Sequence, residues 1–186
     1  MGRVIPFVAC VLVSTMASAT VIVPAELREI VAGSEVIAYA RVTDVRAEWA
    51  DGRRWIDTVV TAEVMSYLKG GPAETVTFKV PGGQLGRYRS VFVGAPTFTR
   101  GDEAVLFLKP HSDDLPDIFG VSQGLFRVRV DSRTGQRMVV PPPIMATGSP
   151  DIAQPLTRGA LDRKPLPFNE FGARVREAMA ATKAAK

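Results

Sequence analysis

Alternating apolar and polar positions dominate the middle of the chain. Val76, Phe78 and Val80 alternate with polar residues, which is typical of a strand with one face in a core. Residues 104–108 are nearly all apolar, and this predicts a strand buried on both faces at the centre of a sheet. The rest of the fold is therefore expected to be organised around a β-rich centre.

Two longer segments before this centre predict a β-hairpin. Residues 36–49 and 55–68 carry many β-branched and aromatic side chains, which favour strands. The Asp51-Gly52 pair between them is a hairpin-turn signal. Apolar positions in the first segment change face near residues 42–45, so we expect a bulge there.

Shorter segments complete the expected sheet. A polar loop is expected at 109–116, and the remaining strands are expected at residues 89–93, 118–121, 125–130 and 137–140. Together these elements predict a mainly β domain. We expect a small antiparallel barrel of the oligonucleotide/oligosaccharide-binding (OB-like) type.

Apolar residues spaced three and four apart predict a short N-terminal helix, at residues 24–33, and a C-terminal amphipathic helix, at 168–184. The second helix is expected to pack on the sheet, with a dimer contact or a basic interfacial helix as alternatives. The expected organisation is a signal peptide at 1–19, a lead-in at 20–35, a β-barrel domain at 36–140, a proline-rich extended segment at 141–167 and a helix at 168–186.

The N-terminus has the pattern of a secretory signal. Arg3 precedes an apolar run at residues 4–16, and Ala17-Ser18-Ala19 offers a cleavage site before Thr20. A retained membrane anchor is the alternative, although the run is short for a bilayer span. We therefore expect an extracytoplasmic protein, periplasmic or secreted, with no membrane span after cleavage.

The amino-acid composition excludes some reactions and partners. The single cysteine, Cys10, lies in the predicted signal, so the mature chain has no thiol and no disulfide. Thiol catalysis is thereby excluded. The formal net charge of +4 is mild and gives no case for a nucleic-acid partner.

Candidate catalytic and metal-ligating residues are few. His111 is the only histidine, no Gly-x-Ser-x-Gly elbow occurs, and the chain lacks a zinc ligand set. His111 with Asp113, Asp114 and Asp117 could hold a hard cation through oxygen ligands, although the spacing is not that of a known calcium loop. A solvated acidic turn is the alternative, and no cofactor is expected.

Two sets of side chains are candidate ligand contacts. Trp49 and Trp55 flank the predicted hairpin turn, where they could pack across the strands or contact a glycan or protein partner. Arg87, Arg89 and Arg100, together with Arg127 and Arg129, could gather into a cationic face for an anionic ligand. Alternatively, outward arginines only protect a sheet edge from pairing.

Several short motifs occur in a fixed order along the chain. They are Tyr67-Leu68-Lys69-Gly70, Pro81-Gly82-Gly83, Gly94-Ala95-Pro96-Thr97-Phe98, Gly101-Asp102-Glu103-Ala104-Val105-Leu106-Phe107-Leu108 and Gln123-Gly124-Leu125-Phe126-Arg127-Val128. As a set they resemble an uncharacterised family of exported bacterial proteins that shares LKG, PGG, GxPxF, GDxVLFL and QGxFxV. That resemblance implies no activity and no site residues.

More distantly, the layout is similar to netrin-like modules and tissue inhibitors of metalloproteinases. That resemblance implies a five-stranded OB barrel. The inhibitors act through an N-terminal cysteine, which the mature chain lacks, so their mechanism is not implied here.

These observations favour a non-enzymatic exported binding or structural module with a protein or glycan partner. Its ligand surface is expected on the barrel face or on loops 81–90, 94–103 and 109–118. One alternative is a protease-associated inhibitor or regulator. The other is a hydrolase or metal-dependent enzyme that uses His111 and the nearby aspartates. The oligomeric state stays open.

Overall fold

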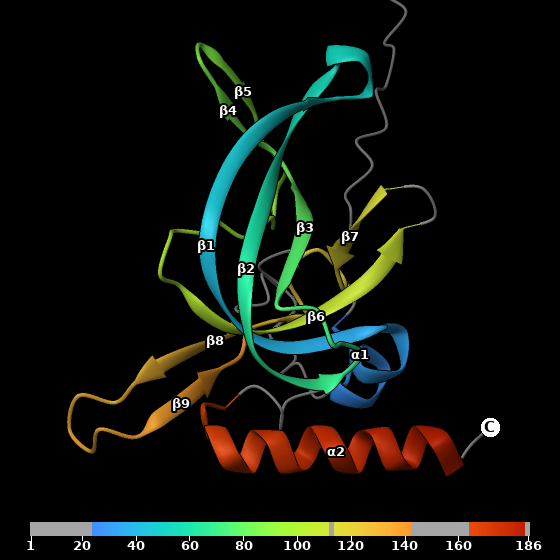
Figure 1. Cartoon of the computed structure of the whole chain (residues 1–186), viewed down its shortest axis with the longest axis vertical. Helices are drawn as coiled ribbons and strands as arrows, with labels where there is room; N and C mark the ends of the chain where they lie inside the picture. Colours follow the sequence, from blue (N-terminus) through green and yellow to red (C-terminus); the bar gives the residue numbers. More distant parts are fainter. Residues whose placement is uncertain (1–23, 112–113, 143–163, 185–186) are drawn as a thin grey trace, which may run out of the picture.

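The computed structural model of the chain describes residues 24–111, 114–142 and 164–184 (Figure 1). It is mainly β, with a short helix near the N-terminus and a C-terminal helix, as predicted. The elements are α1 Leu27–Gly33, β1 Val36–Ala50, the 3-10 turn η1 Asp51–Arg53, β2 Trp55–Lys69, β3 Thr75–Pro81, β4 Gly83–Leu85, β5 Tyr88–Ser90, β6 Glu103–His111, β7 Asp114–Ile118, β8 Leu125–Val130, β9 Arg137–Val140, β10 Leu166–Pro167 and α2 Phe168–Ala184. The predicted signal at 1–19 and residues 143–163 of the expected extended segment lie outside the described residues.

The predicted hairpin of β1 and β2 is confirmed, and it is the longest feature of the fold (Figure 1). The two strands pair antiparallel as far as Ala50↔Trp55. The turn at η1 has φ values of 43° at Asp51 and 63° at Gly52, a conformation that glycine and aspartate tolerate best. The register shifts between Val42 and Asp44, so the expected bulge is also confirmed.

In the main sheet, strand pairing leads from β1 through β2, β3, β7 and β6 back to β1. β1 pairs antiparallel with β2 and with β6, β2 with β3, and β6 with β7. The link between β3 and β7 is parallel and rests on one pair, Lys79↔Asp117. The sheet extends from β6 through β8 and β9 to β10, and β4 and β5 form a separate two-stranded sheet.

The central strand β6 supplies both cores. Val105 and Phe107 belong to a core that also contains buried residues of α1 and α2. Leu106 and its neighbours of the same face belong to a second core, formed with β1, β2, β3, β7 and β8. The expected burial of residues 104–108 on both faces is therefore confirmed, because both sides of β6 are covered.

The apolar stripe of α2 packs on the sheet, as expected. Phe171 and Val175 are buried, and the Phe171 ring lies 4.8 Å from the ring of Phe126 and 6.3 Å from that of Phe107. Aromatic contacts at these separations add to the energy of burial. Within the described chain, no helix combines the length and apolarity that a bilayer span requires.

Three sequence expectations were wrong. The polar loop at 109–116 is replaced by the ends of β6 and β7, because backbone pairing such as His111↔Asp114 does not require apolar side chains. The strand expected at 118–121 ends at Ile118, since the chain turns with positive φ at Gly120 and Val121. The strand expected at 89–93 is β5, which ends at Ser90.

Motif positions near α1 hold the helix to the sheet. The Lys69 ammonium donates hydrogen bonds to the carbonyl oxygens of Val31, at 3.1 Å, and Ser34. These carbonyls lie at the end of α1, where a cation is favoured. The buried Gln123 accepts a hydrogen bond of 2.6 Å from the Ala25 N–H. The LKG and QG motifs thus have structural roles.

Two other motif positions are also structural. A Cβ atom at Gly124 would lie 2.7 Å from the Phe107 carbonyl oxygen, so only glycine fits beside β6. The Asp102 carboxylate accepts hydrogen bonds from the Thr99 N–H, at 3.0 Å, and from Arg127, at 2.9 Å. These contacts therefore give Gly124 and Asp102 structural roles.

Candidate functional site

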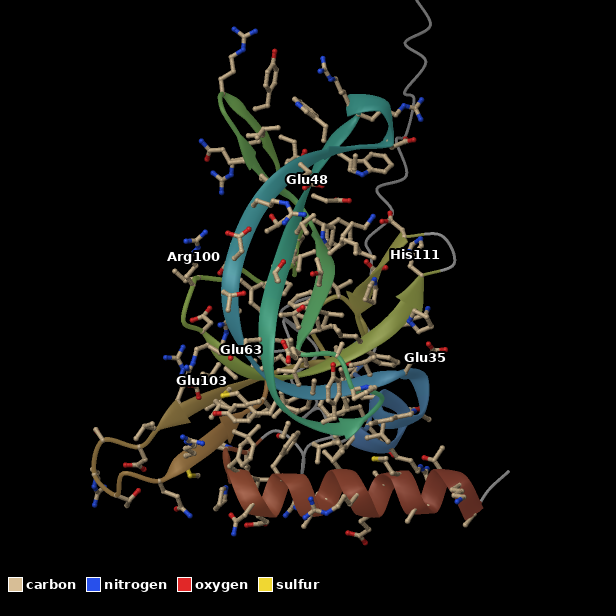
Figure 2. The ribbon with its side chains drawn as sticks, viewed as in Figure 1. Glu35, Glu48, Glu63, Arg100, Glu103 and His111 are labelled. Atoms are coloured by element: carbon tan, nitrogen blue, oxygen red, sulfur yellow. The ribbon has the colours of Figure 1, made fainter. Side chains whose placement is uncertain are left out.

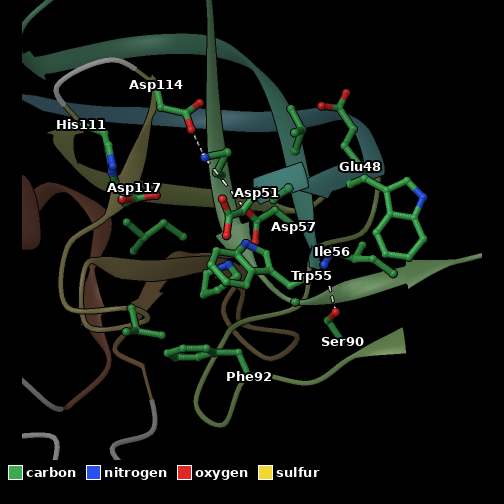
Figure 3. A pocket seen from close by; sticks show the side chains of 18 of the residues that line it. Glu48, Asp51, Trp55, Ile56, Asp57, Ser90, Phe92, His111, Asp114 and Asp117 are labelled. Carbon is green, nitrogen blue, oxygen red and sulfur yellow. Dashed lines mark hydrogen bonds and ion pairs between the residues drawn. The ribbon is translucent and has the colours of Figure 1, made fainter. Parts of the chain in front are cut away.

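An open cleft of about 1050 Å³ lies where the ends of the β1–β2 and β6–β7 hairpins approach the segment after β5 (Figure 3). One side is apolar and includes Trp55, Val91 and Phe92. Glu48, Asp51 and Lys109 also line the cleft. The other charged and titratable side chains, which we call the floor, are Asp57, Lys79, His111, Asp114 and Asp117. Four elements, β2, β3, β6 and β7, supply these groups.

Lys79 occupies the centre of the polar floor. Its ammonium lies 3.8 Å from Asp57 Oδ2 and forms a closer ion pair with Asp114. The side chains of Lys79 and Asp57 are only 18% and 14% exposed. The ammonium therefore lies between a carboxylate from β2 and another from β7, and it offsets one of their two negative charges where little water is available to do so.

The pKa values of the floor follow from this arrangement. Burial raises the pKa of Asp57 above its usual value, although the charge of Lys79 opposes the shift. Burial alone would lower the pKa of Lys79, but its hydrogen bond to Asp114 and the charges of Asp114, Asp57 and Asp117 hold it above the usual value. The Lys79 hydrogen bond lowers the pKa of Asp114. Lys79 is therefore the fixed positive charge of the floor.

His111 and Asp117 form a second polar pair in the cleft. His111 Nδ1 lies 2.8 Å from Asp117 Oδ2, and the histidine side chain is 52% exposed. This exposure agrees with a solvated histidine that a ligand in the cleft could still reach.

The residues proposed as a cation site are only partly brought together. His111, Asp114 and Asp117 line the same cleft, whereas Asp113 lies outside the described residues. No group of three or more potential metal ligands is found in the part of the chain that the structure describes. The ammonium of Lys79, which pairs with Asp114, already supplies positive charge where a cation was expected.

Sequence reasoning missed Asp57 and Lys79. Each is a single charged residue on a strand, a pattern that is common on solvated strand faces and gives no specific signal. Only the pairing of β2 with β3, and of β3 with β7, brings their side chains to one cleft.

The apolar side of the cleft is held against β2. The Ile56 N–H donates a hydrogen bond of 2.9 Å to Ser90 Oγ (Figure 3). Thr58 Oγ1 donates one of 2.7 Å to the carbonyl oxygen of Gly82. A Cβ atom at Gly83 would lie 2.8 Å from Thr58 Oγ1. The PGG motif therefore lets the chain cross β2 closely and places the following segment beside the cleft.

The two tryptophans occupy different surroundings. Trp49 pairs across the strands with Ile56, and its ring meets Tyr88 of β5 edge-on at 5.3 Å. Trp55 lines the cleft and is 49% exposed, as is Phe92. Trp49 also lines the cleft, but its ring packs between two hairpins, whereas Trp55 and Phe92 offer exposed ring surface to a ligand.

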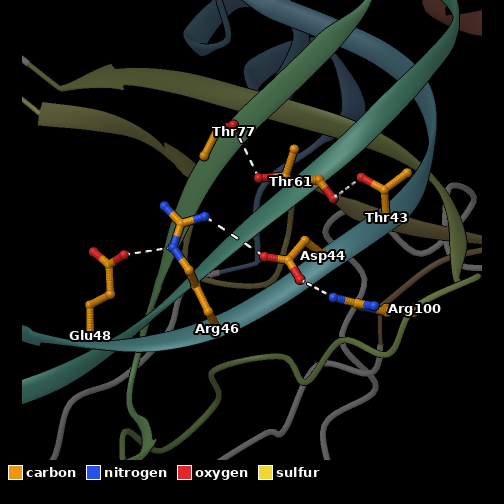
Figure 4. Close-up of polar contacts among 7 residues, drawn as sticks. All are labelled: Thr43, Asp44, Arg46, Glu48, Thr61, Thr77 and Arg100. Carbon is orange, nitrogen blue, oxygen red and sulfur yellow. Dashed lines mark hydrogen bonds and ion pairs between the residues drawn. The ribbon is translucent and has the colours of Figure 1, made fainter.

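The structure does not gather the candidate arginines into one place. Arg87 and Arg89 lie on the β4–β5 hairpin, and the Arg87 guanidinium lies 5.0 Å from the centre of the Tyr88 ring. Arg100, labelled in Figure 2, instead pairs with Asp44 of β1 (Figure 4). Arg127 pairs with Asp102 at 2.9 Å.

Two carboxylates on one face of β1, those of Asp44 and Glu48, are also paired, and Glu48 additionally lines the cleft. Arg46 contacts Glu48 at 2.6 Å and Asp44 at 3.8 Å, and Thr61 and Thr77 approach to 3.3 Å between their hydroxyl oxygens (Figure 4). This face is covered by mutually satisfied polar groups. We therefore assign the cleft, and not this face, as the candidate site. No known protein family, curated protein or solved structure matches the chain.

Proposed function

We propose that the chain is a non-enzymatic binding module, exported to the bacterial envelope or exterior, whose cleft binds a sugar chain. The observation that carries this proposal is the pairing of an exposed aromatic side, Trp55 and Phe92, with a polar floor on which each carboxylate lies against Lys79 or His111. The export step rests on the signal-like pattern of residues 1–19.

An OB-like barrel forms part of the same proposal. The pairing circuit β1–β2–β3–β7–β6–β1, with a parallel β3–β7 link, supports a five-stranded barrel of this type. OB-folds bind oligonucleotides and oligosaccharides through their second and third strands and the loops after the first and fourth. The cleft lies at the corresponding places, the β1–β2 and β6–β7 hairpins.

The charge of the floor favours a sugar over a nucleic acid. Asp57 and Asp114 are paired with Lys79, and Asp117 with His111. Hydroxyl groups both donate and accept hydrogen bonds, so an uncharged sugar can use these groups without a balancing charge. A phosphate backbone would instead meet the five carboxylates that line the same cleft, those of Glu48, Asp51, Asp57, Asp114 and Asp117. The ring face of Trp55 offers a flat apolar surface to the sugar.

The two tryptophans make the binding test specific. The chain contains only two, so Trp49→Phe leaves Trp55 as the sole emitter, inside the cleft. We expect its emission to change saturably when the full chain is titrated with oligosaccharides released from peptidoglycan or from envelope polysaccharides. Adding Phe92→Ala is expected to weaken binding about tenfold, the size of a lost aromatic contact.

The matched control is Met65→Ala. Met65 is an exposed apolar residue of the same strand, β2, at 37% exposure, and it does not line the cleft. Its loss should leave binding unchanged. If no oligosaccharide pool changes Trp55 emission saturably, the sugar-binding proposal is wrong.

One observation favours a second candidate, a hydrolase. His111 and Asp117 lie 2.8 Å apart in the same cleft, and such a pair can serve general base chemistry. Under this alternative, His111→Ala abolishes turnover of whichever envelope oligosaccharide the protein cleaves. Under the binding proposal, the full chain releases no product from the bound sugar, and His111→Ala changes affinity alone.

A further inference from the structure

Arginine and aromatic side chains gather where the β1–β2 and β4–β5 hairpins end together. Arg53 lies on the η1 turn, and Arg87 and Arg89 flank Tyr88 on the second hairpin. The rings of Trp49 and Tyr88 touch edge-on at 5.3 Å, which joins the two hairpins. We call these five residues the hairpin end. The set differs from the cationic face expected from the sequence, because Arg53 replaces Arg100.

The hairpin end carries positive charge that is not neutralised nearby. Among the described residues, no carboxylate forms an ion pair with Arg53, Arg87 or Arg89, and all three are exposed. The two acidic residues of the β1–β2 end are already paired. Asp51 contacts Arg54 at 3.2 Å, and Glu48 contacts Arg46 at 2.6 Å.

The hairpin end also projects from the molecule. β1 pairs with β6 only as far as Arg41, and β2 pairs with β3 only from Asp57. The remaining ends of β1 and β2 therefore extend beyond the main sheet, and together with β4 and β5 they form one extremity of the molecule (Figure 1). Tyr88 is 49% exposed there. A convex extremity buries little surface area against a rigid protein partner, but it can insert among deformable lipid headgroups.

We propose that the hairpin end docks the protein on an anionic lipid bilayer. Tryptophan and tyrosine rings favour the interface between lipid and water. Each arginine near an anionic surface adds attraction that depends on salt. The ligand of this surface is the assembled bilayer. The hairpin end shares Trp49 with the lining of the cleft, but the three arginines that carry the proposal do not line the cleft.

Trp49 is the natural reporter of docking. With Trp55→Phe, Trp49 becomes the only tryptophan of the chain. We expect its emission to shift to shorter wavelength, and the full chain to sediment, with vesicles of phosphatidylcholine and phosphatidylglycerol but not with phosphatidylcholine alone. Added salt should weaken both signals.

The decisive variant removes the three unpaired charges. Arg53→Gln, Arg87→Gln and Arg89→Gln together are expected to lower vesicle affinity on the order of a hundredfold, from about fivefold per arginine. The control removes the same charge elsewhere, from residues that are exposed and distant in the fold, namely Arg129, Arg133 and Arg176. Every variant keeps the same apolar N-terminus, so only the arginine positions differ.

Three results would overturn the proposal. One is an equal loss of affinity in both triple variants, which would mean that net charge alone drives binding. Another is displacement of the vesicles by soluble glycerol phosphate at matched phosphate concentration, which would assign the site to free phosphate. The third is an unchanged Trp49 emission with anionic vesicles. That result would rule out bilayer docking even if an acidic protein binds to the hairpin end.

Discussion

Replacing Lys79 with methionine tests the account of the cleft floor. Methionine keeps most of the side-chain volume but removes the ammonium that lies 3.8 Å from Asp57 and closer to Asp114. Asp57, at 14% exposure, then keeps a charge with no partner. Breaking a fully buried ion pair in this way costs about 3–5 kcal/mol.

The expected cost is smaller here because the floor is partly open to water. We expect Lys79→Met to lower the free energy of unfolding by about 2 kcal/mol near neutral pH. With an m-value of about 2 kcal/mol per molar, the urea midpoint falls by about 1 M. Most of this loss should be recovered by adding Asp57→Asn, because the double variant leaves no unpaired charge.

The pH dependence gives a second check. Burial already raises the pKa of Asp57, and loss of Lys79 raises it further. A carboxyl with a raised pKa in the folded state destabilises the fold above that pKa and ceases to do so as the pH falls through it. The difference between Lys79→Met and the native chain should therefore shrink in acid.

Urea unfolding at neutral and acidic pH measures both effects. Lys109→Met is the matched control, because Lys109 is an exposed lysine of the same cleft and should change stability by less than about 0.5 kcal/mol. A native-like midpoint for Lys79→Met, or a loss that stays constant in acid, would refute the electrostatic role of Lys79.

Four further substitutions test the scaffold. Gly124→Ala should cost about 1–3 kcal/mol in thermal unfolding, because the new Cβ lies 2.7 Å from the Phe107 carbonyl oxygen. Gly172→Ala meets its nearest atom only at 3.5 Å and should instead stabilise α2 by about 0.5–1 kcal/mol. Phe171→Ala should cost about 3–5 kcal/mol in urea unfolding and release α2 to proteolysis. Burial and a hydrogen bond to Glu103 raise the pKa of Tyr39 to about 12. The stabilisation of the fold by the protonated Tyr39 hydroxyl is therefore lost as the pH rises from about 10 through 12. Tyr39→Phe should remove this late step from a titration that follows tyrosinate absorbance.

Local pattern explains the successes of the sequence reasoning. The β1–β2 hairpin follows from alternating apolar residues around an Asp51-Gly52 turn, and α2 follows from an apolar stripe spaced three and four apart. These signals depend on neighbours within a few residues, so the chain itself contains them. The polar ends of β6 and β7 were missed because their pairing is carried by the backbone.

The candidate site was only half visible from the sequence. His111, Asp114 and Asp117 lie within seven residues of one another, so their proximity could be expected. Lys79 comes from another strand, and nothing local places it against Asp114, 35 residues away.

The sequence by itself determined a mainly β chain with a helix towards each end, a signal-like pattern at the N-terminus and a single cysteine, Cys10, within that pattern. Tertiary structure decided which charges meet. Strand order and register brought Lys79 between carboxylates of β2 and β7, separated Arg100 from Arg87 and Arg89, and joined the latter two to Arg53 through the Trp49–Tyr88 contact. The physical reason is that hydrophobic periodicity fixes the face of each strand, whereas the partner across the sheet depends on pairing between segments far apart in the chain.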